Sequence, residues 1–389
     1  MSTPAALPPS LRRRVAILAT LALVATAASV GPLVPAVLAA DDDCSLAGQA
    51  FTVDAAPNEE MAATFARYGD EKRWWTGGDS TYSVALKNGR TAWLFSDTLL
   101  GRVEDDGSQA IDKFVNSSIL LEKDDRIIRT VTGGTASEPT GLLPPTEHGW
   151  YWLGAGHLTD DGSSLDIIFP RFEAFPPFGQ WDWAWDGTVL GRFDPESFNL
   201  RTVVDLPADH GVTWASWITR HGDHTLVYGV EDLGLVKYMH VARVAGDDLT
   251  GDWQFWNGSG WSADEADSVR VMPGVANEYS VAPLRDGYLL VTHDTNELFS
   301  RNILGYTACS PTGPFTQVAT LYETPETGLF GSYGNPNIFT YNAHEHPERR
   351  DGNTLLVTYN VNSFNVDDLY ADATIYRPRF ISVALEPAD

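Results

Sequence analysis

The chain has 389 residues, with 52 acidic against 26 basic side chains and a formal net charge of −26 at pH 7. A charge of this sign and size repels nucleic acid and anionic lipid, so a neutral or cationic partner is favoured over a polyanion. The sequence contains no Walker loop, no GxGxxG after a strand, no GxSxG elbow and no HExxH. It therefore offers no support for the nucleotide-binding, serine hydrolase or zinc protease chemistry that these motifs indicate.

Residues 1–40 have the organisation of a targeting segment. Three consecutive arginines precede an apolar run, and small residues follow up to Ala40. This order predicts a secretory signal peptide, with an uncleaved membrane anchor as the alternative. Gly31 and Pro32 interrupt the apolar stretch, which weakens it as a membrane-spanning helix. We expect a secreted, extracellular protein with no membrane partner after cleavage.

The two cysteines, Cys44 and Cys309, both lie beyond this segment. An exported chain permits a disulfide between them, but the sequence leaves open whether it forms. No CxxC pair or Cys/His cluster is present, so we predict no zinc and no cofactor. A structural calcium ion held by carbonyls and waters stays open, because such a site leaves no sequence pattern.

One pattern recurs five times: a short apolar strand, a turn rich in Asp, Gly or Asn, and a second strand of β-branched and aromatic residues. The second strands begin at Thr91, Ser164, His224, Tyr288 and Thr354. Their spacing leaves room for four strands per unit. The repeat therefore predicts an all-β fold, a five-bladed β-propeller of four-stranded antiparallel blades.

The expected organisation has three parts: a signal peptide over 1–40, a leader over 41–75 and a single propeller domain over 76–389. The leader contains a short strand near Phe51 and a helical pattern from Asn58. Pairing of that strand with the last blade would close the ring and leave no long edge unpaired. The funnel at the centre of the ring is then the default site.

Residues before first strands and after second strands should meet on one face of the propeller. The polar residues at these positions are Asp79, Asp97, Arg171, Glu231, Asp232, Glu278, Asp294, Asn335 and Asn362. Asp79 and Glu278 occupy equivalent places, each just before a Tyr-Ser-Val core. Two carboxyl groups across a funnel are what glycoside hydrolysis requires. The alternatives are a turn cap for Asp79 and an arginine partner for Glu278.

We assign Asp79 as base or nucleophile and Glu278 as general acid. Asp97 is predicted to modulate them, either by raising a neighbour's pKa through like-charge repulsion or by orienting the acid. The alternative for Asp97 is a bond to the backbone of the next loop.

An aromatic loop over 172–185 lies on the predicted site face. Flat aromatic rings offer apolar surfaces to the C–H faces of sugars. The expected substrate-binding residues are Arg171, Trp181, Trp183, Trp214, Glu231, Asp232, Asp294 and Asn335. Packing between blades is the alternative for each tryptophan, and a solvated strand end for each acid. His344 and His346 alternate as metal ligands can, but the repeat places them in a turn on the opposite face, so no metal site is predicted.

Two phrases, 75–86 (WTGGDSTYSVAL) and 89–98 (GRTAWLFSDT), resemble the opening blade of secreted bacterial propellers grouped as domains of unknown function. Further phrases that fit this family lie at 275–281, 310–315, 341–348, 359–363 and 375–380. The resemblance covers nearly the whole chain after residue 40.

Related propellers include the arabinan- and xylan-cleaving enzymes of glycoside hydrolase family 43, and a similar opening motif is found in endo-D-arabinanases. In family 43, three acids lie at the starts of first strands in blades one, two and three. This chain departs from that pattern, because blade two offers only Glu147 and blade three only Asp209. We treat Glu278 in blade four as a permuted equivalent, which leaves inversion or retention open.

The leading hypothesis is a secreted glycoside hydrolase that acts on a neutral polysaccharide or oligosaccharide, with a furanoside such as arabinan favoured. The expected partner is a carbohydrate and not nucleic acid, and a monomer is expected. The alternative is a non-catalytic, lectin-like propeller, because one fold serves both roles. A polysaccharide lyase is a third option, disfavoured because the acidic protein would repel uronic acids.

Overall fold

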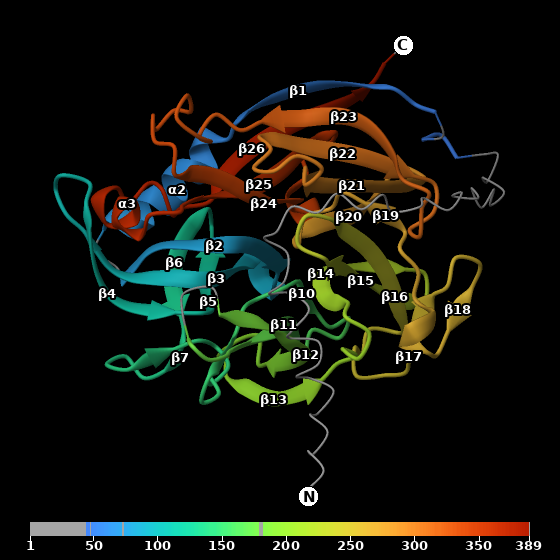
Figure 1. The fold of residues 1–389 in the computed structure, drawn as a ribbon, viewed down its shortest axis with the longest axis horizontal. Helices are drawn as coiled ribbons and strands as arrows, with labels where there is room; N and C mark the ends of the chain where they lie inside the picture. Colours follow the sequence, from blue (N-terminus) through green and yellow to red (C-terminus); the bar gives the residue numbers. More distant parts are fainter. Residues whose placement is uncertain (1–43, 47, 72–73, 179–181, 389) are drawn as a thin grey trace, which may run out of the picture.

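The computed structural model describes residues 44–46, 48–71, 74–178 and 182–388. The expected signal peptide and Trp181 lie outside these ranges. Five antiparallel sheets are arranged around a centre, with β2, β10, β14, β20 and β24 nearest to it (Figure 1). The predicted five-bladed β-propeller is therefore confirmed.

Each blade is one sheet. The first contains β2 (Trp74–Ala85), β3 (Arg90–Val103), β5 (Ser118–Lys123) and β6 (Arg126–Val131), with β4 (Gln109–Val115) paired to β3. The second contains β10 (Gly156–Leu158), β11 (Leu165–Ala174), β12 (Trp183–Phe193) and β13 (Leu200–Asp205), with β9 (Gly149–Tyr151) paired to β11. The third contains β14 (Thr213–His221), β15 (His224–Asp232), β16 (Lys237–Ala245), β17 (Trp253–Trp256) and β18 (Trp261–Ser262), with β19 (Met272–Pro273) paired to β16.

The fourth blade contains β20 (Tyr279–Leu284), β21 (Gly287–His293), β22 (Asn302–Ala308) and β23 (Thr316–Glu323). The fifth contains β24 (Ile338–Glu345), β25 (Thr354–Ser363), β26 (Arg379–Pro387) and β1 (Phe51–Pro57). Outside the blades lie the short pair β7 (Gly133–Gly134) and β8 (Pro139–Thr140) and the helices α2 (Glu59–Asp70) and α3 (Val366–Ala371).

Two contacts tie the N-terminal part of the described chain to the ring. Strand β1 pairs antiparallel with β26 along its whole length, so the fifth blade is completed by the leader. A disulfide joins Cys44 to Cys309, which follows the third strand of the fourth blade. Among the described residues, no helix is long and apolar enough to cross a membrane.

The core consists of the apolar runs that the repeat contributes from each blade. Leu94, Ile167, Leu226 and Leu290, from the second strands of four successive blades, are at most 1% exposed and belong to one cluster. Burying a leucine or isoleucine side chain contributes roughly 1.5–3 kcal/mol, so these strands anchor the blades. Each inner strand pairs with the second strand of its own blade and lies on the side of the centre.

The observed strands differ from the predicted ones in one respect that affects the site. Asp79 and Asp97 were expected just outside their strands, but both lie inside, in β2 and β3. The sequence pattern does not predict these strand bounds, because the register between β2 and β3 shifts at several β-bulges, one of them between Gly78 and Ser80. Bulges re-aim side chains and are common beside active sites.

The placement predicted for His344 is wrong. It lies in β24, the inner strand of the fifth blade, and not in a turn on the far face. A bulge between Tyr341 and His344 inserts extra residues into this strand. The prediction made from the regular repeat therefore ended this strand too early.

Candidate active site

Asp79 and Asp97 come from adjacent strands of the first blade. Gly78 pairs with Thr98 and Ser80 with Phe95, so the two acids stand beside each other across the bulge. Ser80 and Thr81 have φ values of 69° and 64°, a conformation that costs a non-glycine residue on the order of 1–3 kcal/mol. The bulge thus sets the direction of the Asp79 side chain, and its energetic cost is the backbone strain at Ser80 and Thr81.

Glycine lets a further segment approach this bulge. A Cβ atom on Gly77 would lie 2.2 Å from the carbonyl oxygen of Tyr376, which accepts a 2.9 Å hydrogen bond from the Gly78 amide. Tyr376 is thereby brought beside Asp79. Gly77, two residues before Asp79, is needed for this close packing.

Two tyrosines bind the Asp79 carboxyl group. Tyr341 donates a hydrogen bond of 2.7 Å to Asp79 Oδ2, and Tyr376 is a second side-chain partner. Burial raises the pKa of Asp79 to about 6, and the hydrogen bonds from the tyrosines oppose this increase. Asp79 therefore ionises within the range in which many hydrolases operate.

Asp97 is fixed by two donors on one oxygen. Trp152 Nε1 and Asn116 Nδ2 lie 2.6 Å and 2.9 Å from Asp97 Oδ1. Burial, followed by the negative charge of Asp79, raises the pKa of Asp97 to about 7. The two aspartates thus influence each other's ionisation, as neighbouring carboxyl groups do.

Glu278 reaches the same place from the fourth blade, where it directly precedes β20. Ser80 Oγ donates a 2.6 Å hydrogen bond to Glu278 Oε1, and the Glu278 side chain is 12% exposed. Burial, with the charge of Asp79 as a smaller cause, raises the pKa of Glu278 well above its usual value, and the hydrogen bond from Ser80 opposes this. Burial therefore favours the protonated form of Glu278.

His344 completes the group from the fifth blade. Its Nδ1 atom lies 4.0 Å from Glu278 Oε2, and its ring stacks on Tyr82 with centroids 4.4 Å apart. Burial lowers the pKa of His344 to about 4, so the ring is neutral. Nε2 lies 3.2 Å from the Thr81 carbonyl oxygen, which can only accept. We therefore assign the proton to Nε2, which leaves Nδ1 as an acceptor facing Glu278.

No lysine or arginine nitrogen of the described residues lies within 4 Å of the Asp79, Asp97 or Glu278 carboxyl oxygens. The alternative in which Glu278 pairs with an arginine is therefore not observed. Within the same ranges, no group of three or more His, Cys, Asp or Glu side chains could hold a metal ion. Acid–base or nucleophilic chemistry is what this arrangement of carboxyl groups can perform.

The other residues predicted for substrate binding are spread more widely. Trp183 packs against Trp152 with ring centroids 5.2 Å apart, one contact away from Asp97. Asn362 donates to the Tyr341 hydroxyl at 3.4 Å, and so stands behind Asp79. Trp214 is 0% exposed and donates a 2.9 Å bond to Glu265, so it offers no surface to a sugar.

The remaining predicted residues bind side chains outside the group around Asp79. Their partners are Arg270 for Glu231, Lys237 for Asp232, Asp186 for Arg171, Ser300 for Asp294 and Asp368 for Asn335. The residues at the family 43 positions also differ from the three acids of the site. The side chain of Glu147 is 89% exposed. The Asp209 amide donates to Glu265.

Sequence reasoning did not identify several residues that contact the three acids. These are Ser80, Asn116, Trp152, Tyr341, His344 and Tyr376. Four of them lie in the phrases that carry the family resemblance, 75–86, 341–348 and 375–380. Those phrases were the available signal, whereas Asn116 and Trp152 lie outside them.

The chain belongs to the family described as "Domain of unknown function (DUF5005)", whose profile matches residues 62–385. It is 23% identical over 305 residues to "Notoamide biosynthesis cluster protein J'" of Aspergillus versicolor, covering 73% of this chain and 83% of the relative. The resemblance to a propeller family of unknown function is thus confirmed. The fungal relative shows that similar chains are not restricted to bacteria.

Two solved structures are similar to this chain to different degrees. A putative hydrolase from Bacteroides ovatus has a TM-score of 0.72 at 18% identity, covering 86% of this chain and 94% of its own. The α-L-arabinofuranosidase PaAbf62A from Podospora anserina has a TM-score of 0.47 at 12% identity, covering 82% and 99%. The first of these supports the same propeller architecture for this chain.

Proposed function

We propose that this protein is an exported glycoside hydrolase that acts on a neutral polysaccharide or oligosaccharide, with a furanoside such as arabinan favoured. The observation that carries the proposal is the meeting of Asp79, Asp97 and Glu278 from blades one and four, with no cationic partner among the residues that the structure describes. A group of buried carboxyls with displaced pKa values costs stability and is typical of a catalytic site.

The pKa directions divide the roles. At pH 7, Asp79, with its pKa raised by burial to about 6, is mainly ionised, whereas burial raises the pKa of Glu278 well above its usual value and favours its protonated form. Glu278 then donates its proton to the glycosidic oxygen as the bond breaks. Asp79 either removes a proton from the attacking water or attacks the anomeric carbon itself.

Asp97 acts on Asp79 in this proposal. Its carboxyl is held in place by Trp152 and Asn116, so the distance between the two acids is fixed. A negative charge on Asp97 disfavours ionisation of Asp79 and increases its basicity. The buried tyrosines at Asp79 limit this effect because they stabilise its carboxylate.

Export is supported by two features. The expected signal peptide precedes the described residues, and the disulfide between Cys44 and Cys309 suits an oxidising compartment.

The neighbour from Bacteroides ovatus is described as a putative hydrolase, which agrees with the proposed class of enzyme.

The test is hydrolysis by the protein lacking residues 1–40. Glu278→Gln should reduce activity on a panel of neutral glycans by at least about 100-fold, because the general acid is lost. Glu323→Gln is the matched control, since Glu323 lies on the outer strand of the same blade and pairs with Arg301. Full activity of Glu278→Gln would remove this residue from the mechanism.

A lectin-like propeller is the second candidate, favoured by the aromatic cluster of Trp150, Trp152, Phe172 and Trp183. Such rings bind sugars without chemistry. Binding of a neutral glycan with no new reducing ends would favour this candidate over the hydrolase.

A further inference from the structure

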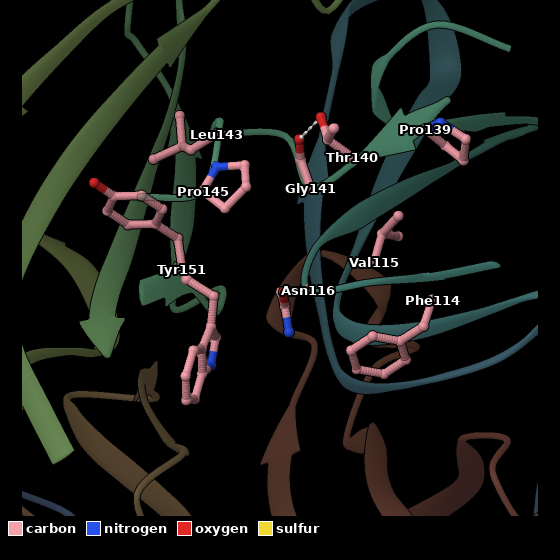
Figure 2. Close-up of a pocket in the computed structure, with 10 residues that line it drawn as sticks. Phe114, Val115, Asn116, Pro139, Thr140, Gly141, Leu143, Pro145 and Tyr151 are labelled. Carbon is pink, nitrogen blue, oxygen red and sulfur yellow. Dashed lines mark hydrogen bonds between the residues drawn. The ribbon is translucent and has the colours of Figure 1, made fainter. Parts of the chain in front are cut away.

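A pocket of about 170 Å³ lies between the first and second blades. Its lining residues are Phe114, Val115, Asn116, Pro139, Thr140, Gly141, Leu143, Pro145, Trp150 and Tyr151. Figure 2 shows Pro145 and Tyr151 on one side, Phe114 and Val115 on the other, and Asn116 between them. None of these residues was identified from the sequence as a binding residue.

The pocket adjoins Asp97 through both of its walls. Asn116 lines it and donates to Asp97 Oδ1 at 2.9 Å. Trp150 also lines it, and its ring centroid is 5.9 Å from that of Trp152, which donates to the same oxygen at 2.6 Å. A molecule bound in the pocket is therefore separated from Asp97 by the side chains of Asn116 and Trp152.

The lining matches an uncharged molecule that has both apolar and hydroxyl faces. It contains no Asp, Glu, Lys, Arg or His. Phe114, Pro145 and Trp150 supply flat apolar surface, and Asn116 and Thr140 supply an amide and a hydroxyl. Sugar rings present C–H faces and hydroxyl edges in this way, and aromatic side chains with a few polar groups are how proteins bind them.

One hydrogen-bond donor of the lining is unsatisfied. Trp150 Nε1 is buried and has no hydrogen-bond acceptor among the described residues. A buried donor without an acceptor costs about 1–3 kcal/mol, which a hydroxyl of a bound ligand would recover. The volume is below the roughly 300–1,000 Å³ typical of drug-sized ligand sites, so the pocket suits one ring.

We propose that this pocket is a subsite for one uncharged sugar residue of the substrate, placed so that the adjoining glycosidic bond reaches Asp79 and Glu278. The inference rests on the proposed function and adds to it a binding place for one sugar residue of the neutral substrate. A uronic acid is disfavoured, because its carboxylate would lie near Asp97 and the described lining residues offer no cation to pair with it. Specificity for neutral glycans is thus built into the site.

The experiment measures binding by calorimetry to the Glu278→Gln protein, which should bind without turnover. The probes are arabinotriose, xylotriose and galactotriose, with trigalacturonate as the charged counterpart. We expect at least one neutral trisaccharide to bind and trigalacturonate to bind at least tenfold more weakly. Adding Trp150→Phe, which keeps a ring but removes the N–H, should weaken neutral binding about tenfold.

Phe114→Ala provides a second variant that is safe for folding, because Phe114 is already 53% exposed. Ile128→Ala is its control, since Ile128 is 48% exposed on β6 of the same blade and does not line the pocket. Phe114→Ala should weaken neutral binding severalfold, whereas Ile128→Ala should leave it unchanged.

Failure of the subsite and failure of the hydrolase give different results. Hydrolysis by the parent protein with KM unchanged in both pocket variants would overturn the subsite and leave the proposed function standing. Neutral binding that is lost in Trp150→Phe, with no hydrolysis by the parent, would support the subsite and overturn the enzyme. Absence of binding by every trisaccharide, or preference for trigalacturonate, would also overturn the subsite.

Discussion

Ser80 Oγ donates a 2.6 Å hydrogen bond to Glu278 Oε1 and thereby connects the first blade to the fourth across the centre of the ring. Ser80 follows Asp79 directly, so the bulge that aims Asp79 also positions the proposed acid. The relative placement of the two carboxyls depends on a single strained segment, Ser80 and Thr81.

The first prediction concerns the alkaline side of the pH profile. The hydrogen bond from Ser80 stabilises the ionised form of Glu278 and lowers its pKa. Ser80→Ala should raise this pKa further, so the loss of kcat/KM at high pH should move to higher pH. The profile of Ser80→Ala, measured with a neutral glycan, checks this. A shift to lower pH would contradict the proposed assignment of Glu278 as the acid.

Asp97→Asn should leave the start of the acidic side of the profile in place. Burial raises the pKa of Asp79 to about 6 and that of Asp97 to about 7, so Asp97 is still largely protonated where Asp79 ionises. The asparagine oxygen can still accept from Trp152 and Asn116. The variant should instead lose the change in kcat/KM near pH 7, where ionisation of Asp97 in the parent places a second negative charge beside Asp79. A variant profile that keeps this change near pH 7 would show that Asp97 does not modulate Asp79.

His344 is predicted to be a positioning residue for Glu278. Its Nδ1 acceptor favours the protonated carboxyl, either directly or through one water across the 4.0 Å separation. His344→Phe keeps a ring against Tyr82 but removes the acceptor, so the pKa of Glu278 should fall. We expect kcat to decrease with KM nearly constant and the alkaline limb to move to lower pH. A uniform loss of activity with an unmoved limb would indicate a role in packing alone.

The disulfide is expected to stabilise the closed ring. It connects positions 265 residues apart, and cross-links that close long loops restrict the unfolded chain strongly. Cys44→Ser with Cys309→Ser should lower the free energy of unfolding by about 2–4 kcal/mol. Denaturant unfolding of the double variant and of the parent under oxidising conditions measures the difference. Equal stabilities would show that the pairing of β1 with β26 holds the leader without the disulfide.

The five blades were predictable because each second strand is an apolar run that must be buried, and the spacing of these runs is visible in the sequence. The approach of Asp79 and Glu278 was predictable for a related reason, since each comes shortly before the Tyr-Ser-Val core of an inner strand. Neither inference required a detail of local backbone geometry.

The rest of the site depends on departures from regular strands. The bulge before His344 moved it from an expected turn into the wall beside Glu278. Asn116 and Trp152 reach Asp97 from a connection between strands and from the loop after β9. Positions such as these are fixed by tertiary packing, and no local pattern in the sequence predicts them.

The last prediction follows from the cost of burying a carboxyl group. Burial raises the pKa of Asp79 from 3.8 to about 6, so the folded protein binds this proton more tightly than the unfolded chain does. The contribution of Asp79 to the free energy of unfolding is therefore most favourable below pH 3.8, and it falls as the pH rises through about 6. Asp79→Asn removes this dependence and should stabilise the protein at pH 8 by about 1–3 kcal/mol, with a much smaller effect at pH 4. Denaturant unfolding at both pH values, with exposed Asp252→Asn as the control, measures the difference. Destabilisation by Asp79→Asn at pH 8 would mean that the ionised carboxylate is needed for folding, which a site that sacrifices stability for catalysis does not require.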